Sequence, residues 1–248
     1  MKVVFHDDFH AVYASDPAAA AGRMAAILEV ISPRAELVAP QPAPPEAIAA
    51  AHDPDHVAWV RSRGLYEIAS LAAGGALLAA ELGLGEPALG LIRPPGHHAS
   101  RGSAWGYCYF NNMAVALLEL KRRGLLKSAL VLDIDLHYGD GTVNILEGRG
   151  WVEVYNVEAR AREPYLEEVA RVLEGCQAGL IAISAGFDMA KDDWGNLLLA
   201  EDYRRIGQLA CQTAQRNRGG CCAILEGGYN HAILGHNVLA LMQGMGGE

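Results

Sequence analysis

The sequence contains little that would direct the protein to a membrane or to an oxidising compartment. Its 248 residues include only five cysteines, an odd number without the paired spacing of a disulfide framework or a zinc finger. The longest uncharged apolar stretch, residues 68–80, is shorter than the roughly 20 residues that a helix needs to cross a bilayer. The N-terminus leads into a strand-like segment instead of a signal peptide. We therefore expect a cytoplasmic protein without a membrane partner.

Positive charge is also scarce. The chain has 20 Lys and Arg residues against 29 Asp and Glu residues, a net charge of −9, and its longest basic run is residues 121–123. Nucleic-acid-binding proteins carry clustered basic residues, so the composition argues against a nucleic-acid partner. No Pro-rich or Gly-rich linker divides the chain, and 51% of it is hydrophobic. These features predict one domain over residues 1–248, and they leave its oligomeric state open.

Four short apolar runs predict the fold class. Residues 88–92, 129–132, 178–185 and 222–225 each have the length and composition of a fully buried strand. Segments with helical periodicity separate them, which indicates an α/β fold with a mostly parallel central sheet and helices on both faces. The predicted helices are residues 18–31, 45–63, 66–83, 111–123, 142–147, 163–174, 201–217 and 233–245, and the further predicted strands are 35–39 and 151–157.

Polar residues follow each of the four apolar runs, and they suggest a metal site. In a parallel sheet, ligands bind beyond the carboxyl ends of the strands, so these residues should meet in one crevice. Asp135 and His137 lie two residues apart and would face the same side of an extended segment, together with Asp133. Asp188, which follows the run 178–185, is the expected third ligand.

One histidine and two carboxylates leave coordination positions open, which is typical of catalytic metal sites. Zinc is the expected ion, and iron(II) is the alternative, because nitrogen and oxygen ligands suit both. Taken alone, the Asp-x-Asp-x-His pattern also fits an ordinary polar strand end, and an isolated Asp188 would more often cap a helix. The metal hypothesis is favoured because charged groups at the ends of apolar strands need a partner to offset their desolvation.

Two adjacent histidines, His97 and His98, follow residues 93–96, in which two prolines and a glycine define a rigid turn. A neutral imidazole held there can accept a proton from water and later donate one to a leaving amine. Asp133 and Asp140 are the carboxylates available to orient the two rings. Taken singly, each histidine is as often structural.

Tyr229 follows two glycines, whose backbone freedom would let the phenol reach the crevice. Its hydroxyl could donate a hydrogen bond to an oxygen on which negative charge develops. The alternative is a buried tyrosine with an ordinary hydrogen-bond partner.

Together, five motifs closely resemble the histone deacetylase superfamily, and the first ten residues are most similar to its acetylpolyamine amidohydrolase branch. The motifs are Arg93-Pro-Pro-Gly-His-His-Ala99, Gly106-Tyr-Cys-Tyr-Phe-Asn-Asn112, Asp133-Ile-Asp-Leu-His-Tyr-Gly-Asp-Gly-Thr142, Ser184-Ala-Gly-Phe-Asp188 and Leu225-Glu-Gly-Gly-Tyr229. The resemblance implies an arginase–deacetylase fold and zinc-dependent removal of acyl groups from amines.

The resemblance also implies roles for individual residues. Asp135, His137 and Asp188 match the zinc ligands, His98 the general base and acid, His97 its electrostatic companion, and Tyr229 the hydroxyl that polarises the carbonyl. Substrate contacts are expected at Gly106, Tyr107, Cys108 and Arg23, the last of which matches an internal arginine of the family. A potassium ion is expected near Asp133, Asp135 and His137, where backbone carbonyls and Asn156 would bind it.

The segments between His56 and Arg93 and between Thr142 and Ser184 are much shorter than in most relatives, which predicts a more open mouth to the site. The leading hypothesis is a zinc-dependent amidohydrolase acting on a small acetylated amine, such as an acetylpolyamine or an acyl-lysine-like compound. Three alternatives remain: a protein or histone-type lysine deacetylase, a binuclear manganese ureohydrolase, and a catalytically silent acyl-amine-binding protein. The ureohydrolase shares the Asp-x-Asp-x-His pattern but needs a second acidic pair, which does not follow Asp188 directly.

Overall fold

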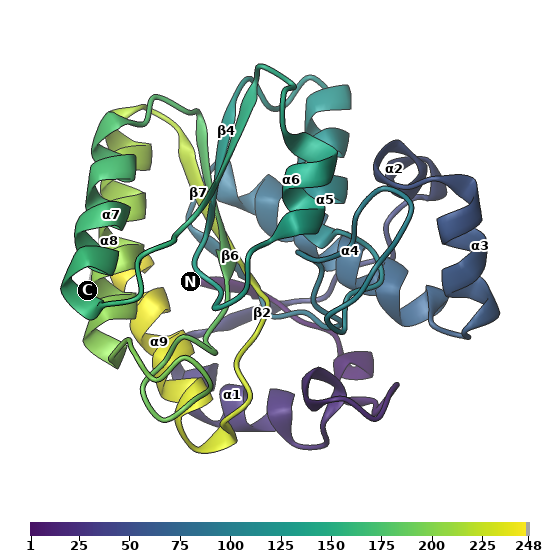
Figure 1. Ribbon diagram of the computed structural model, residues 1–248, viewed down its shortest axis with the longest axis horizontal. Coiled ribbons are helices and arrows are strands. Elements are labelled where there is room, and N and C mark those ends of the chain that lie inside the picture. The colour runs from purple at the N-terminus through teal and green to yellow at the C-terminus, as the bar shows by residue number, and fades with distance from the viewer. Residues whose placement is uncertain (247–248) are drawn as a thin grey trace.

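Seven parallel strands form one sheet at the centre of the molecule (Figure 1). The computed structural model describes residues 1–246. The strand order is β2-β1-β3-β7-β6-β4-β5, and every pairing is parallel, so the predicted fold class is confirmed. The strands are β1 (Lys2–Val4), β2 (Glu36–Val38), β3 (Ala88–Gly90), β4 (Ala129–Asp133), β5 (Val152–Asn156), β6 (Leu180–Ala185) and β7 (Gly220–Leu225).

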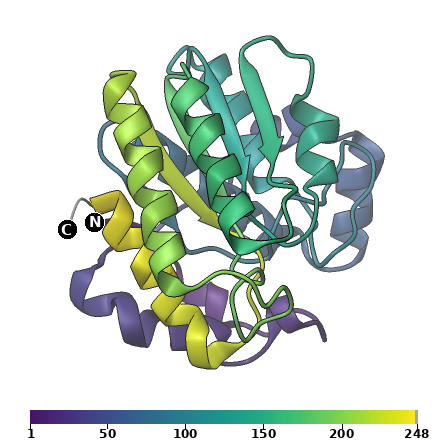
Figure 2. The ribbon, with the colours of Figure 1, turned by 60° about the vertical axis from the view of Figure 1, so that its left-hand side comes forward.

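Helices cover both faces of the sheet (Figures 1 and 2). The helices on one face pack around α4, and those on the other pack around α8 and α9. The first group contains α2 (Pro45–Ala51), α3 (Pro54–Ser62), α4 (Tyr66–Gly83), α5 (Asn112–Arg122) and α6 (Asp140–Leu146). The second group contains α1 (Arg23–Ile31), α7 (Arg162–Gly175), α8 (Ala200–Arg216) and α9 (His231–Gly246).

The central strands β4, β6 and β7 are buried along their whole length, as expected for apolar runs with helices on both sides. Their register aligns the strand ends. Asp133 at the end of β4 pairs with Ser184 of β6 and with Asn156 of β5. Ala185 pairs with Leu225 at the ends of β6 and β7. The segments that follow these strands therefore leave the sheet side by side at one edge.

Two predicted helices begin or break differently in the structure. The helix predicted over residues 45–63 is two helices, α2 and α3, because Pro54 lacks an amide hydrogen and favours an extended conformation at Asp53, whose ψ is 149°. The helix predicted from residue 18 begins at Arg23. Gly22 precedes it in the left-handed conformation, with φ of 83°, and residues Pro17–Ala19 form a separate 3-10 turn.

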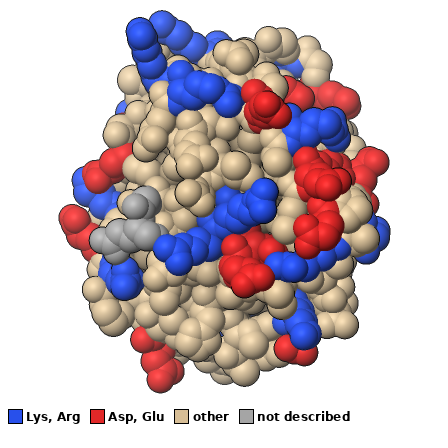
Figure 3. All heavy atoms as spheres, turned by 90° about the vertical axis from the view of Figure 1, so that its left-hand side faces the viewer, with Lys and Arg blue, Asp and Glu red and all other residues tan. Residues whose placement is uncertain are grey.

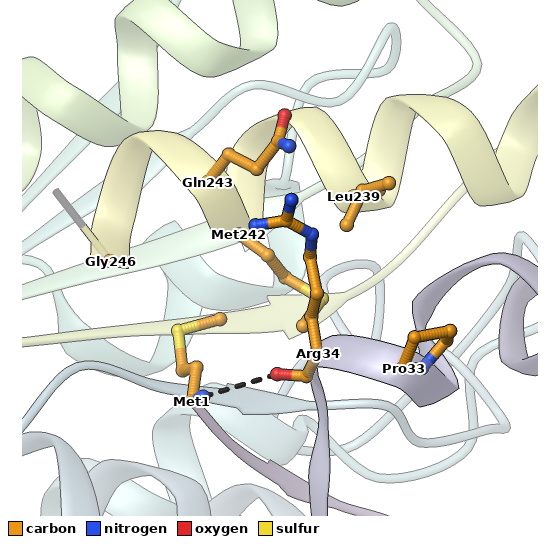
Figure 4. Close-up of a pocket in the computed structure, with 7 residues that line it drawn as sticks. All are labelled: Met1, Pro33, Arg34, Leu239, Met242, Gln243 and Gly246. Carbon is orange, nitrogen blue, oxygen red and sulfur yellow. Dashed lines mark hydrogen bonds between the residues drawn. The ribbon is translucent and has the colours of Figure 1, made fainter. Parts of the chain in front are cut away.

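Elsewhere the surface carries a face of mixed charge and a hollow at the amino end of β1. On the face that carries α7, α8 and α9, basic and acidic side chains lie beside one another (Figure 3). A hollow of about 600 Å³ opens at the amino end of β1, between Arg34 and α9 (Figure 4). Among the described residues, none that lines it is His, Cys, Asp or Glu. Among the described residues, no helix is both long and apolar enough to cross a membrane.

Candidate metal centre

Asp135, His137 and Asp188 converge beyond the carboxyl ends of β4 and β6. One ligand atom from each lies within 4.8 Å of the other two. The Nδ1 atom of His137 lies 3.1 Å from Oδ1 of Asp135 and 3.1 Å from Oδ2 of Asp188. Both carboxylates are buried, whereas about a third of the His137 side chain is exposed. The three residues that the sequence singled out as ligands therefore form one half-open cluster.

Backbone amides bind the carboxylate oxygens that face away from this cluster. The amide of Gly227 donates to Oδ2 of Asp135 at 2.9 Å, and the amide of Leu136 donates to Oδ1 of Asp188 at 3.0 Å. Gly186 and Gly227 allow this close approach, because a Cβ atom at either position would lie within 2.6 Å of Oδ2 of Asp135. The segments after β4, β6 and β7 thus fix both carboxylates.

The cluster has more acceptors than donors. Oδ2 of Asp188 is buried and has no hydrogen-bond partner among residues 1–246, although Nδ1 of His137 lies beside it. A single imidazole nitrogen carries at most one hydrogen, so it cannot satisfy two carboxylates at once. A divalent cation bound by one nitrogen and two carboxylate oxygens would satisfy all three atoms, and this donor set suits zinc or iron.

The pKa values of these groups reflect the same concentration of negative charge. The hydrogen bond to Asp135, followed by the adjacent carboxylate of Asp188, raises the pKa of His137 to about 10. Burial, followed by the neighbouring charge of Asp135, raises the pKa of Asp188 to about 7. Negative charge held in a buried site is stabilised by a cation, so both shifts are consistent with a metal-binding centre.

Each of the two adjacent histidines pairs with its own carboxylate. Nδ1 of His97 lies 3.1 Å from Oδ2 of Asp133, and Nδ1 of His98 lies 2.7 Å from Oδ1 of Asp140. Asp140 is the first residue of α6, and Asp133 is the last residue of β4. Both histidines are therefore paired with the carboxylates that the sequence offered, and their rings lie 4.0 Å apart between centroids, tilted by 43°.

The two imidazoles have opposite electrostatic environments. Burial lowers the pKa of His97, but the charges of Asp135 and Asp133 outweigh it and raise the pKa well above its usual value. For His98, burial and the positive charge of His97 lower the pKa to about 4, despite the hydrogen bond to Asp140. These surroundings favour the charged form of His97 and the neutral form of His98, which can accept a proton.

Glu226 positions the histidine turn, a role that the sequence did not reveal. Its buried Oε2 accepts hydrogen bonds from the backbone amides of Gly96 at 2.7 Å and His97 at 3.2 Å. Burial and nearby carboxylates raise the pKa of Glu226 to about 7. The available signal was its place directly after the apolar strand β7 and three residues before Tyr229.

Two tryptophans border the site and were also missed. Trp105 stacks on His98 with centroids 3.8 Å apart, and its indole nitrogen donates to Oδ2 of Asp140 at 2.9 Å. Trp194 stacks on Tyr229 at 4.1 Å. Both indoles are about half exposed, at 55% and 51%. A large aromatic residue in a short polar loop was the signal that could have identified them.

A cavity of about 270 Å³, hereafter the site cavity, opens beside the three candidate metal ligands, and His137 lines it. His97, His98 and His137 form part of its lining, as do Tyr107 and Tyr229, whose rings meet edge to face with centroids 6.2 Å apart. Gly228, with φ of 113°, provides the turn that brings Tyr229 to the cavity. The remaining lining residues are Pro95, Trp105, Gly106, Trp194 and Gly227.

Arg23, Cys108 and Asn156, which were predicted to contact substrate or potassium, do not line the site cavity. Arg23 is fully buried, and its guanidinium donates to the carbonyls of Gly228 and Glu226, so it fixes the turn before Tyr229. Cys108 is buried beneath the turn, where its sulfur accepts from the amide of His98. Asn156, proposed for a potassium ion, accepts from the amide of Gly139 at 2.7 Å.

Comparison with known proteins identifies the family to which this arrangement is most similar. The family model described as the histone deacetylase domain matches residues 18–161 and 153–245. A probable deacetylase of Methanothermobacter thermautotrophicus is 32% identical over 74% of this chain and 66% of its own length. A histone deacetylase-like amidohydrolase of Pseudomonas aeruginosa is 30% identical over 74% of this chain and 59% of its own length.

A human relative of lower identity and a solved structure are also similar to this chain. The human polyamine deacetylase HDAC10 is 29% identical over 74% of this chain and 34% of its own length. A crystal structure of the HDA15 HD domain superposes with a TM-score of 0.88 at 24% identity, covering 100% of this chain and 89% of that one. The fold is thus the arginase–deacetylase fold, and the chain spans less than two thirds of the length of these three curated relatives.

Proposed function

Because this chain belongs to the histone deacetylase family, we propose that it is a zinc-dependent amidohydrolase that removes an acetyl group from an amine. The observation that carries the proposal is the convergence of three groups of residues on one cavity. A cluster with one nitrogen and two carboxylate ligands lies beneath two histidine–carboxylate pairs, and Tyr229 lies on the cavity wall.

Asp135, His137 and Asp188 would hold the zinc ion. When bound, the ion polarises the acyl carbonyl and lowers the pKa of water. The unpartnered Oδ2 of Asp188 and the two carboxylates around one imidazole nitrogen support this assignment. Iron(II) would be accepted by the same donor set.

His98 acts as the general base and then as the general acid. It is neutral at pH 7, and Asp140 binds its Nδ1 atom, so Nε2 is the nitrogen that takes the proton from water as the water oxygen attacks the acyl carbon. The same proton is then donated to the amine nitrogen as the carbon–nitrogen bond breaks. The products are a carboxylic acid and a free amine.

Tyr229 and His97 stabilise the charge that develops during this reaction. The Tyr229 hydroxyl donates a hydrogen bond to the carbonyl oxygen as it becomes negative. Burial raises the pKa of Tyr229, so the phenol keeps its proton for this role. His97 remains protonated beside Asp133 and favours negative charge nearby, while its own charge holds His98 neutral before the reaction.

The substrate is a small acetylated amine, either an acetylpolyamine or an acyl-lysine-like compound. The cavity of about 270 Å³ is lined in part by aromatic residues, which suits a linear methylene chain better than a bulky group. Relatives named polyamine deacetylase support the first class, and the name histone deacetylase of the family model supports the second. A potassium ion bound near Asn156 by backbone carbonyls after Asp133 would complete the site.

The geometry argues against a binuclear ureohydrolase. A second metal ion would need the oxygens of Asp133, but its Oδ2 pairs with His97 and its Oδ1 accepts from the amide of Asp135. Among the described residues, one cluster of three potential metal ligands is present. The residues retained for proton transfer, His98 and Asp140, also argue against a silent binding protein.

A deacylation screen tests the proposal. Zinc-loaded protein is offered acetylpolyamines, acetyl-lysine peptides and a ureohydrolase substrate, and the released amine is measured before and after treatment with a chelator. We expect chelator-sensitive hydrolysis of at least one acetylated amine. Hydrolysis of the ureohydrolase substrate alone, or tight binding of acetylated amines without turnover, would replace the proposal by one of its alternatives.

A further inference from the structure

A second hollow lies beside the site cavity and shares part of its lining. This rim hollow, of about 270 Å³, shares Trp105, Gly106 and Tyr107 with the site cavity. Its other walls come from Trp59 and Arg63 at the end of α3, from Leu65, and from residues Ala104, Cys108 and Tyr109. A substrate whose acetyl group lies in the site cavity would therefore pass its amine half over Tyr107 into this hollow.

The backbone that borders both hollows has an unusual conformation. Gly106 and Tyr107 both adopt the left-handed conformation, with φ of 57° and 67°. Such a conformation is costly for a residue with a side chain, and it occurs mostly where a side chain must be placed for function. Tyr107 lines both hollows, and its ring meets that of Tyr229 edge to face.

Arg63 is the charged side chain of the rim hollow. Its guanidinium carbon lies 5.4 Å from the centroid of the Trp59 ring, and it forms no ion pair with any residue from 1 to 246. Neither Asp nor Glu lines the rim hollow or the site cavity. A guanidinium without an acidic partner offers paired donors that match a carboxylate.

The carboxylates beside the mouth of the site cavity either accept hydrogen bonds already or line a different hollow. Both oxygens of Asp140 are bound, by His98 and by Trp105. Asp193 accepts from the amides of Trp194, Tyr229 and Asn230. Asp55 lines a separate hollow on the other side of Trp59. Lys191 and Asp192 in the neighbouring loop are exposed and of opposite charge, so they favour neither sign of substrate.

We infer that the rim hollow binds the amine half of the substrate through a carboxylate held by Arg63, with the methylene chain lying against Trp59, Trp105 and Tyr107. This inference rests on the proposed function and narrows its substrate class. The preferred substrate is an acetylated amine that ends in a carboxylate, as in an acyl-lysine-like amino acid, and a polycation such as an acetylpolyamine is disfavoured by like charge.

A matched set of probes tests the inference. The probes are ω-acetamidoalkanoates, the corresponding primary amides, and mono-acetylated diamines, each with four, five or six methylene groups. These compounds carry the same scissile bond and differ in the charge at the far end. The zinc-loaded full chain, Arg63→Gln, Arg63→Glu and Arg61→Gln are compared by kcat/KM. Arg61 is the control because it lies two residues away on α3 and packs on Tyr66 instead.

We expect the wild-type chain and Arg61→Gln to prefer the carboxylate over the amide by about threefold to fivefold at the best chain length, the size of a partly exposed ion pair. Arg63→Gln should abolish the preference for the carboxylate by raising the KM of that probe. Arg63→Glu should prefer the mono-acetylated diamine instead. Turnover of the neutral amide should stay unchanged in Arg61→Gln, whose side chain packs on Tyr66. Hydrolysis without a charge preference, or a preference that Arg63→Gln retains, would overturn the inference and leave the proposed function standing.

Binding separates failure of the inference from failure of the proposed function. If no probe is hydrolysed, the proposed reaction is wrong, and the same probes are titrated calorimetrically into the zinc-loaded chain and Arg63→Gln. Tighter binding of the carboxylate that depends on Arg63 would still support the rim hollow as its site. Equal binding of all three probes, or none, would overturn it.

Discussion

Nδ1 of His98 lies 2.7 Å from Oδ1 of Asp140, and the other oxygen of the same carboxylate accepts from the indole of Trp105. The carboxylate therefore fixes the orientation of the imidazole and directs its Nε2 atom to the cavity. Trp105 packs on the face of the ring and holds the carboxylate from the solvent side. The pair combines a buried ring with a half-exposed acid, so its geometry depends on both contacts.

Replacing Asp140 with Asn should lower turnover by about 10- to 100-fold, because the amide no longer selects the tautomer that leaves Nε2 free to accept a proton. Zinc content and the unfolding temperature should stay near their wild-type values. Steady-state kinetics with metal analysis checks this, with Asp192→Asn as the exposed control in a nearby loop. Full activity in Asp140→Asn would contradict the role assigned to the His98–Asp140 pair.

Replacing Tyr229 with Phe should lower kcat by roughly 100- to 1000-fold, the usual loss when one donor to a developing oxyanion is removed. The ring would keep its stacking on Trp194, so the fold and the metal affinity should not change. The control is Tyr138→Phe, an exposed phenol on the loop after β4. Equal losses in the two variants would show that the hydroxyl of Tyr229 has no specific function.

Replacing Gly106 with Ala should impair catalysis beyond its effect on stability. The new Cβ would lie 2.3 Å from the His98 ring, so the imidazole must move. Gly148→Ala is a matched control, because Gly148 has a similar positive φ of 76° but open space around it. Both variants should lose about 1–2 kcal/mol of unfolding free energy from backbone strain. Only Gly106→Ala should lose most of its turnover, which kinetics and denaturant unfolding together will measure.

His52 predicts how stability depends on pH away from the metal centre. Its Nδ1 contacts the carbonyl of Ser100, its Nε2 accepts from the amide of Asn111, and burial lowers its pKa to about 3. As the pH falls below 6.5, His52 becomes protonated in the unfolded chain but stays neutral in the folded chain. The contribution of neutral, buried His52 to the unfolding free energy is therefore complete above pH 6.5. It is lost as the pH falls towards 3, with a slope of about 1.4 kcal/mol per pH unit.

Denaturant unfolding between pH 7 and pH 4 measures this contribution. His52→Gln should show a shallower loss of unfolding free energy on acidification than the wild-type chain, although it will be less stable at pH 7. His236→Gln, at an exposed position of α9, serves as the control. Parallel pH profiles for all three proteins would contradict the assignment to His52.

The convergence of the site could be predicted from the sequence because parallel strands end at one edge. Asp133, Asp188 and Tyr229 each follow a buried apolar run, so their approximate positions depend on the sheet alone. The split of the predicted helix at His52 and Asp53 was missed, although Pro54 marks it locally. Glu226 and Trp105 carried a local signal in the sequence, but their contacts could not be predicted, because each is made with a segment distant in the chain, at Gly96 and Asp140.

The central claim is that Asp135, His137 and Asp188 bind one catalytic zinc ion. The most direct test removes metal with a chelator and then adds zinc stepwise while hydrolysis of an acetylated amine is recorded, for the wild-type chain and for Asp188→Asn. We predict no activity in the metal-free chain, and a rise that reaches its maximum at one zinc per chain. Asp188→Asn should stay inactive at that ratio. Hydrolysis that survives metal removal, or that requires two ions per chain, would contradict the account.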